Sequence, residues 1–164
     1  MDRSSSPRTT IRAVPEESWR SSANGTTAVV RVARVPGSLI SVFYSTTLPK
    51  SPGSAAQARL FLDQVRTQLD SEVFENARLL LSELVANAIE HVLEEGDLEV
   101  RIALSEGVLR IEVLDPGPGF VPPPRRPGSD RGWGLHFTDR LSSRWAADFD
   151  ERARVWFELS LSGS

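Results

Sequence analysis

A long helical segment followed directly by two alternating segments is the feature that most restricts the folds open to this chain. Apolar residues recur at helical spacing from Glu72 to Glu95, and Gly96 then supplies a residue that commonly ends a helix. The next two segments alternate apolar with polar or small residues, and Glu106-Gly107 between them predicts a turn. The alternating apolar residues are Leu98, Val100, Ile102 and Leu104, followed by Leu109, Ile111 and Val113. The sequence therefore predicts a helix followed by a β-hairpin.

The segment before the long helix predicts a strand and a further helix. Ser41–Leu48 is rich in β-branched and aromatic residues and is closed by Pro49, as expected of a strand. Apolar residues then recur at helical spacing, and Ser54 is a candidate cap for the helix that they predict. These apolar residues are Ala58, Phe61, Leu62, Val65 and Leu69.

The C-terminal segments complete the pattern. The sequence predicts a short helix over Gly134–Leu141 and an antiparallel strand pair formed by Trp145–Phe149 and Val155–Leu161. Together the elements predict an α/β (α+β) two-layer sandwich, with helices on one face of a mixed, mostly antiparallel sheet.

The first forty residues differ in composition from the rest. They are rich in Ser and Thr and hold few large apolar side chains, which favours a flexible tail over residues 1–40. Val29–Val35 alternates enough to predict one short strand there, ended by Pro36-Gly37. A single domain is predicted over residues 41–164, consistent with a length of 164 residues.

Composition excludes several kinds of protein. The chain has 19 basic and 22 acidic residues, a net charge of −3, which argues against nucleic acid as a direct partner. It has no cysteine, so disulfides, thiolate zinc sites and cysteine nucleophiles are excluded. No apolar run is long enough to cross a membrane, and no apolar segment follows the basic N-terminus as in a secretory signal. A cytoplasmic protein is predicted.

The basic residues include a single lysine, Lys50. A phosphate-binding loop of the G-x-x-x-x-G-K-[ST] type needs its lysine after a glycine, whereas Lys50 follows Pro49. No glycine-rich loop precedes Lys50, so it does not match the strand lysine of eukaryotic-type kinases either. Any phosphate chemistry must therefore use another scaffold.

One face of the long helix carries polar residues at spacing i, i+4, i+7, namely Glu83, Asn87 and Glu90. A solvated helix face accounts for this pattern in the simplest way. Asn87 is unusual because asparagine is a poor mid-helix residue unless its amide has a partner. An amide oxygen can bind Mg²⁺ while a carboxylate one turn away accepts a proton, so a catalytic face is the alternative.

Two glycine-containing motifs follow the hairpin. The first, Asp115-Pro116-Gly117-Pro118-Gly119-Phe120, fits either an ordinary turn or a site where a strand-end carboxylate accepts a hydrogen bond from a ligand. The second, Arg131-Gly132-Trp133-Gly134-Leu135, opens the predicted short helix, and glycine-exposed amides at a helix N-terminus favour phosphates.

The three motifs, in this order, resemble those of the GHKL superfamily of ATPases and kinases, which have the Bergerat ATP-binding fold. SELVANAIEH resembles the N box, LDPGPGF the first glycine box and RGWGL the second. Within this superfamily, TTLPKSPGSAAQAR and VWFEL resemble segments of bacterial anti-sigma-factor serine/threonine-protein kinases, especially the actinobacterial ones. The resemblance covers about residues 42–161.

This resemblance implies a site for ATP and Mg²⁺. Glu83 corresponds to the catalytic general base that activates a serine hydroxyl, and Asn87 to the Mg²⁺ ligand that links metal and phosphates. Asp115 corresponds to the residue that binds the adenine amino group. Residues 120–131 correspond to a lid that includes Arg131. The remaining cofactor-binding positions are Gly117 and Gly119 beside the adenine, and Gly132, Gly134 and Leu135 beside the phosphates.

The chain departs from the family pattern just before VWFEL, where Ala153-Arg154 replaces a residue pair that usually ends in Thr. In relatives that hydroxyl supports the adenine-binding aspartate, so its loss is expected to weaken nucleotide binding by about 1 kcal/mol.

Three functions remain open on the sequence alone. The first is an ATP-dependent protein serine kinase that phosphorylates a STAS-domain antagonist and sequesters a sigma factor, with a homodimer also allowed. The second is a catalytically weak or inactive, nucleotide-gated protein-binding regulator. The third, the catalytic domain of a histidine kinase, is disfavoured because the first forty residues contain no histidine to accept a phosphoryl group.

Overall fold

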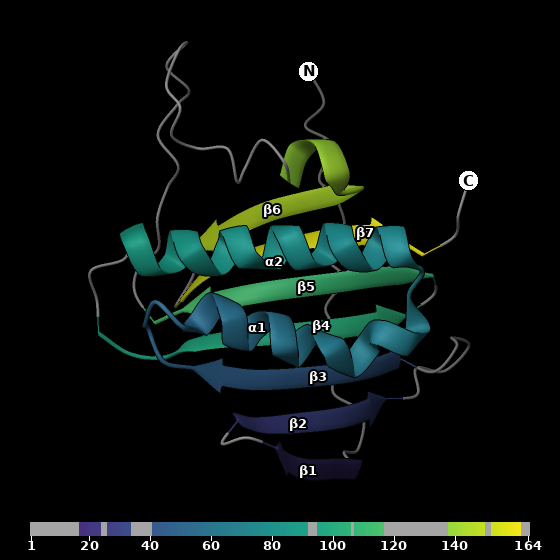
Figure 1. Ribbon diagram of the computed structural model, residues 1–164, viewed down its shortest axis with the longest axis horizontal. Coiled ribbons are helices and arrows are strands. Elements are labelled where there is room, and N and C mark those ends of the chain that lie inside the picture. The colour runs from purple at the N-terminus through teal and green to yellow at the C-terminus, as the bar shows by residue number, and fades with distance from the viewer. Residues whose placement is uncertain are drawn as a thin grey trace, which may run out of the picture.

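A seven-stranded antiparallel sheet forms one layer of the computed structural model (Figure 1). The structure describes residues 17–23, 26–33, 41–91, 95–105, 107–116, 138–149 and 152–161. The strands lie in the order β1-β2-β3-β4-β5-β7-β6, and each adjacent pair is antiparallel. Their bounds are β1 Glu17–Ala23, β2 Thr26–Ala33, β3 Ser41–Leu48, β4 Leu98–Ser105, β5 Val108–Asp115, β6 Arg144–Phe149 and β7 Ala153–Ser160.

Two helices, α1 (Ser54–Leu62) and α2 (Ser71–His91), cover one face of this sheet, with the 3₁₀ segment η1 (Asp63–Gln68) between them (Figure 1). Residues 138–141 are also helical. Asp70 caps α2, since its Oδ1 accepts a hydrogen bond from the Val73 amide at 2.8 Å. Ser54 does not cap α1, contrary to the sequence prediction. It is the first residue of the helix, and its hydroxyl donates to the Pro49 carbonyl instead.

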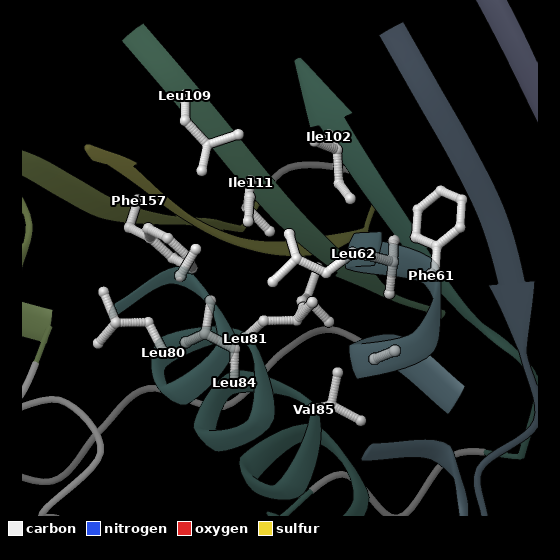
Figure 2. Close-up of a cluster of buried hydrophobic side chains, with 14 of the residues drawn as sticks. Phe61, Leu62, Leu80, Leu81, Leu84, Val85, Ile102, Leu109, Ile111 and Phe157 are labelled. Carbon is white, nitrogen blue, oxygen red and sulfur yellow. The ribbon is translucent and has the colours of Figure 1, made fainter. Parts of the chain in front are cut away.

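The hydrophobic core lies between the helices and the sheet, as the alternating pattern predicts. Leu80, Leu81, Leu84 and Val85 of α2 face the apolar residues of the strands (Figure 2). Ile102 of β4, Leu109 and Ile111 of β5 and Phe157 of β7 supply the opposing surface. Burying a side chain of this size contributes about 1.5–3 kcal/mol, so this layer accounts for much of the stability.

The predicted two-layer α+β sandwich is confirmed, and the described strand pairings show why the sheet is antiparallel and not mixed. The α1–α2 hairpin takes the chain back and forth once between β3 and β4, so β4 returns antiparallel to β3. The strand β6 does run in the same direction as β5, but β7 is inserted between them. The strands β5 and β6, which run in the same direction, therefore do not pair.

The structure differs from the predicted tail in residues 17–33. It contains two strands there, β1 and β2, and β2 overlaps the single short strand predicted over Val29–Val35. The register pairs β2 with β3, for example Val30 with Tyr44, so the hairpin extends the sheet at the β3 edge. Residues 1–16 and 34–40 lie outside the described part.

We expect deletion of residues 1–38 to lower the melting temperature by several degrees. The deletion removes the backbone pairing of β2 with β3, and each such hydrogen bond is worth about 0.5–1.5 kcal/mol net. It also leaves β3 as an open edge, which favours association between chains. Scanning calorimetry and light scattering of the full and truncated chains would measure both effects. An unchanged melting temperature would mean that the hairpin adds nothing to the stability of the sheet.

Candidate functional site

The ends of several strands meet at one edge of the sheet. The β3 strand ends at Leu48, which pairs with Leu98 at the start of β4. The β5 strand ends at Asp115, which pairs with Ala153 at the start of β7. The first glycine motif of the sequence therefore begins where four strands end or begin side by side.

Asp115 places a buried carboxylate at this edge, on the face that the helices cover. Side chains alternate along β5, and Leu109, Ile111 and Val113 are buried beneath the helices. Asp115 belongs to the same alternating set and is only 3% exposed. A buried carboxylate is costly without a partner, so its contacts decide what the site can do.

The partner of Asp115 is Lys50, which lies in the turn after β3. The Lys50 Nζ is 3.1 Å from Oδ1 and 2.9 Å from Oδ2 of Asp115. The two side chains are 12% and 5% exposed, so the ion pair is largely shielded from water. Sequence reasoning examined Lys50 only as a lysine of known phosphate motifs and did not find this role. The available signal was the position of Lys50 in the sequence, two residues after the end of the predicted strand Ser41–Leu48.

The α2 helix brings Glu83 and Asn87 toward the same edge. Only six residues separate the end of α2 at His91 from the start of β4 at Leu98, so α2 ends near the edge where β4 begins (Figure 1). Glu83 and Asn87 are half-buried, and neither side chain has a hydrogen bond or ion pair within the described part of the chain. Their oxygens are the kind of ligand that suits a hard cation such as Mg²⁺.

Pro116, the residue after β5, lies close to Gly96, which precedes β4. Gly96 has φ of 138°, a conformation that side chains rarely adopt, and a Cβ added there would lie 2.8 Å from Cγ of Pro116. The segment before β4 thus packs closely against the residue that follows Asp115. Six predicted site residues lie beyond this point and outside the described residues, namely Gly117, Gly119, Arg131, Gly132, Gly134 and Leu135.

Arg154, which stands where relatives usually carry Thr, does not lie beside Asp115. Residues alternate along β7, so Ala153 shares the face of Asp115, while Arg154 points to the face without helices. There Arg154 Nη2 binds Asp148 Oδ2 at 2.7 Å. Trp156 Nε1 also donates to Asp148 Oδ2, at 3.2 Å. The strand position opposite Asp115 is therefore Ala153, whose side chain has no hydrogen-bond donor.

Ion pairs on the outer face hold the same edge together. Glu99 of β4 accepts hydrogen bonds from Arg101 Nε at 2.6 Å and from Arg152 Nη1 at 3.0 Å. Partial burial alone would raise the pKa of Glu99, but the hydrogen bonds and charges of Arg101 and Arg152 outweigh it and lower the pKa. Glu99 therefore stays ionised at neutral pH and ties β4 to the residue preceding β7.

No described helix is long and apolar enough to span a membrane. No three His, Asp or Glu side chains of the described segments lie together as a metal-binding cluster.

The chain was also compared with known proteins. No curated protein matches it. Residues 48–157, more than half of the chain, match the family model described as the histidine kinase-like ATPase domain. The matched range contains Lys50, Glu83, Asn87 and Asp115. Because the match covers this edge of the sheet and most of the chain, the protein belongs to the histidine kinase-like ATPase domain family.

Proposed function

We propose that this protein binds Mg²⁺-ATP and acts as a protein serine kinase on a STAS-domain antagonist, while it holds a sigma factor. The observation that carries the ATP-binding part is the buried Asp115 carboxylate at the end of β5. Its Oδ1 already accepts a hydrogen bond from a nitrogen donor, the Lys50 ammonium, so the carboxylate can accept one from the amino group of adenine.

Different residues of the chain bind the base and the phosphates of the nucleotide. Asp115 accepts a hydrogen bond from the exocyclic amino group of adenine and thereby selects the base. Asn87 offers an amide oxygen to Mg²⁺, which when bound offsets the negative charge of the phosphates. Both residues hold the substrate in place, so their contribution is mainly to binding and orientation.

Glu83 lies one helical turn before Asn87 on the same face of α2, as a general base requires. Its carboxylate takes the proton from a serine hydroxyl of the protein substrate while the serine oxygen bonds to the γ-phosphorus. The bond between that phosphorus and the β–γ bridging oxygen breaks, and ADP leaves. The products are phosphoserine and ADP, and the proton remains on Glu83 until it passes to solvent.

A second candidate is a nucleotide-gated regulator that binds its partners without phosphoryl transfer. The observation that favours it is that the half-buried Glu83 and Asn87 side chains have no hydrogen bond or ion pair within the described residues, as on a solvated helix face, so no described group orients Glu83 as a base. Both candidates predict nucleotide binding, and only the first predicts transfer.

Incubation with labelled ATP and candidate STAS-domain proteins separates the two candidates. We expect label on a serine of one partner, in a reaction that requires Mg²⁺, with mass spectrometry to locate the phosphate. The matched control is the same partner with that serine replaced by alanine. Partner binding without label would favour the regulator, and the absence of both partner binding and label would contradict both candidates.

A further inference from the structure

The Lys50 ammonium contacts both oxygens of the carboxylate that the proposed function assigns to the adenine amino group. Lys50 and Asp115 are 65 residues apart in the chain and meet only because β3, β4 and β5 end or begin at one edge of the sheet. Ala153, opposite Asp115, contributes no side-chain donor. Among the described residues, Lys50 is thus a charged donor that holds Asp115, through a hydrogen bond to Oδ1 and an ion-pair contact with Oδ2.

This contact is stronger than the one that a base can offer. Both donors make a hydrogen bond to an ionised acceptor, but only the Lys50 ammonium adds the attraction of a full opposite charge, because the adenine amino group is neutral. The shielding of both side chains from water strengthens the ion pair further. A ligand amino group can form a hydrogen bond with the Asp115 carboxylate only if the contact between Lys50 and Asp115 weakens.

The turn that carries Lys50 is held in place, so its side chain alone can release the carboxylate. Ser54 at the start of α1 donates a hydrogen bond to the Pro49 carbonyl and lies 3.0 Å from the Ser51 hydroxyl. The Ser54 amide also donates to the Ser51 carbonyl, at 3.0 Å. The main chain on both sides of Lys50 is thus fixed to α1, while its four-carbon side chain can change rotamer.

We propose that Lys50 is a built-in competitor for the amino group of the ligand and sets both the affinity and the base selectivity of the site. The inference rests on the proposed nucleotide binding at Asp115. When Lys50 holds Asp115, only the fraction of molecules with a released carboxylate binds adenine, and the apparent Kd equals the intrinsic Kd divided by that fraction.

Base selectivity follows from the same contact. An adenine amino group donates to Asp115 and competes with Lys50. A 6-oxo purine such as hypoxanthine presents a carbonyl oxygen instead, which the Asp115 carboxylate repels and the Lys50 ammonium attracts. Removal of the ammonium should therefore help adenine nucleotides and should not help 6-oxo nucleotides.

The test compares the Kd values of ATP and inosine triphosphate for the unaltered chain, Lys50→Met and Lys50→Arg. Methionine keeps most of the side-chain volume and removes the charge, so Lys50→Met should bind ATP about tenfold more tightly, with no gain for inosine triphosphate. Lys50→Arg retains an ion pair and should keep the weaker ATP affinity. The matched control is Arg110→Met, which removes an ion-paired cation from the outer face, five residues before Asp115 on β5, and should leave both Kd values unchanged.

The outcomes separate this inference from the proposed function. If the unaltered chain binds ATP and Lys50→Met binds it equally or less tightly, Lys50 does not compete with the ligand for Asp115, and the proposed function stands. If neither chain binds ATP at millimolar concentration, both are wrong.

A nucleotide-free measurement tests the contact itself. Because Lys50 is the single lysine, an amine-reactive reagent modifies only Lys50 and the N-terminal amino group, which mass spectrometry separates. The reaction at Lys50 should be several-fold faster in Asp115→Asn than in the unaltered chain, with the N-terminal reaction as the internal standard. Equal rates would contradict the ion pair as the restraint on Lys50.

Discussion

Replacement of Asp115 by asparagine should abolish the rise in melting temperature that Mg²⁺-ATP produces in the unaltered protein. A ligand present at about 100 times its Kd stabilises the folded state by about 2.7 kcal/mol. For a domain of this size that corresponds to a shift of roughly 5 °C or more. Asparagine keeps one acceptor oxygen, but it has no charge and replaces the second oxygen by an NH2 donor, so the variant loses most of the base contact.

The melting temperature without nucleotide should also fall in Asp115→Asn. The variant leaves the Lys50 ammonium without its carboxylate, and removal of one partner of a buried pair typically costs about 3–5 kcal/mol. The informative quantity is therefore the shift caused by nucleotide within each variant. Asp148→Asn is the matched control, because Asp148 pairs with Arg154 on the outer face, and this variant should keep the full shift. If nucleotide raises the melting temperature of Asp115→Asn as much as that of the unaltered chain, Asp115 does not bind the adenine base.

Replacement of Glu83 by alanine should remove phosphoryl transfer and leave ATP binding nearly unchanged. Loss of a general base typically lowers the rate about 10²–10⁴-fold. Glu83 is not part of the core stripe of α2 and is half-buried, so its removal should change the melting temperature little. Single-turnover transfer to a confirmed STAS-domain substrate and ATP binding would be measured in parallel.

Glu75→Ala provides the matched control for Glu83. Glu75 lies two turns earlier on the same helix, where it is exposed and 3.7 Å from Arg78, and its loss should leave transfer intact. Full transfer activity in Glu83→Ala would show that the polar face of α2 is a solvated surface, as its simplest interpretation holds.

The local pattern predicted the elements that carry the site. Period-2 alternation identifies β4 and β5 because each buries one face, and helical spacing identifies α2 because it buries one stripe. The end of β5 at Asp115 followed from the glycines and prolines that come next in the chain. Glu83, Asn87 and Asp115 could thus be named before the fold was known, while their assigned roles remain proposals.

Features that depend on distant pairing could not be predicted in this way. The order β5-β7-β6 is set by which strands pair, and no local pattern encodes it. The Lys50–Asp115 contact joins residues that meet across three strands. The direction of Arg154 depends on the register that places Ala153 opposite Asp115, which the sequence of β7 alone does not reveal.

The β1–β2 hairpin had a sequence signal that composition concealed. Asn24-Gly25 separates the two strands, and this dipeptide between alternating segments is a strong hairpin signal. The abundance of Ser and Thr around it favoured a tail, because such residues offer little apolar surface. Backbone pairing with β3 extends the sheet there instead.

Equilibrium dialysis of labelled ATP against the full chain tests most directly whether Asp115 anchors a bound nucleotide. With Mg²⁺ present, we predict saturable binding of one ATP per chain, which unlabelled ATP displaces and Asp115→Asn abolishes. The Asp148→Asn variant should bind as the unaltered chain does. The absence of saturable binding at millimolar ATP, or equal binding by Asp115→Asn, would contradict the proposed site.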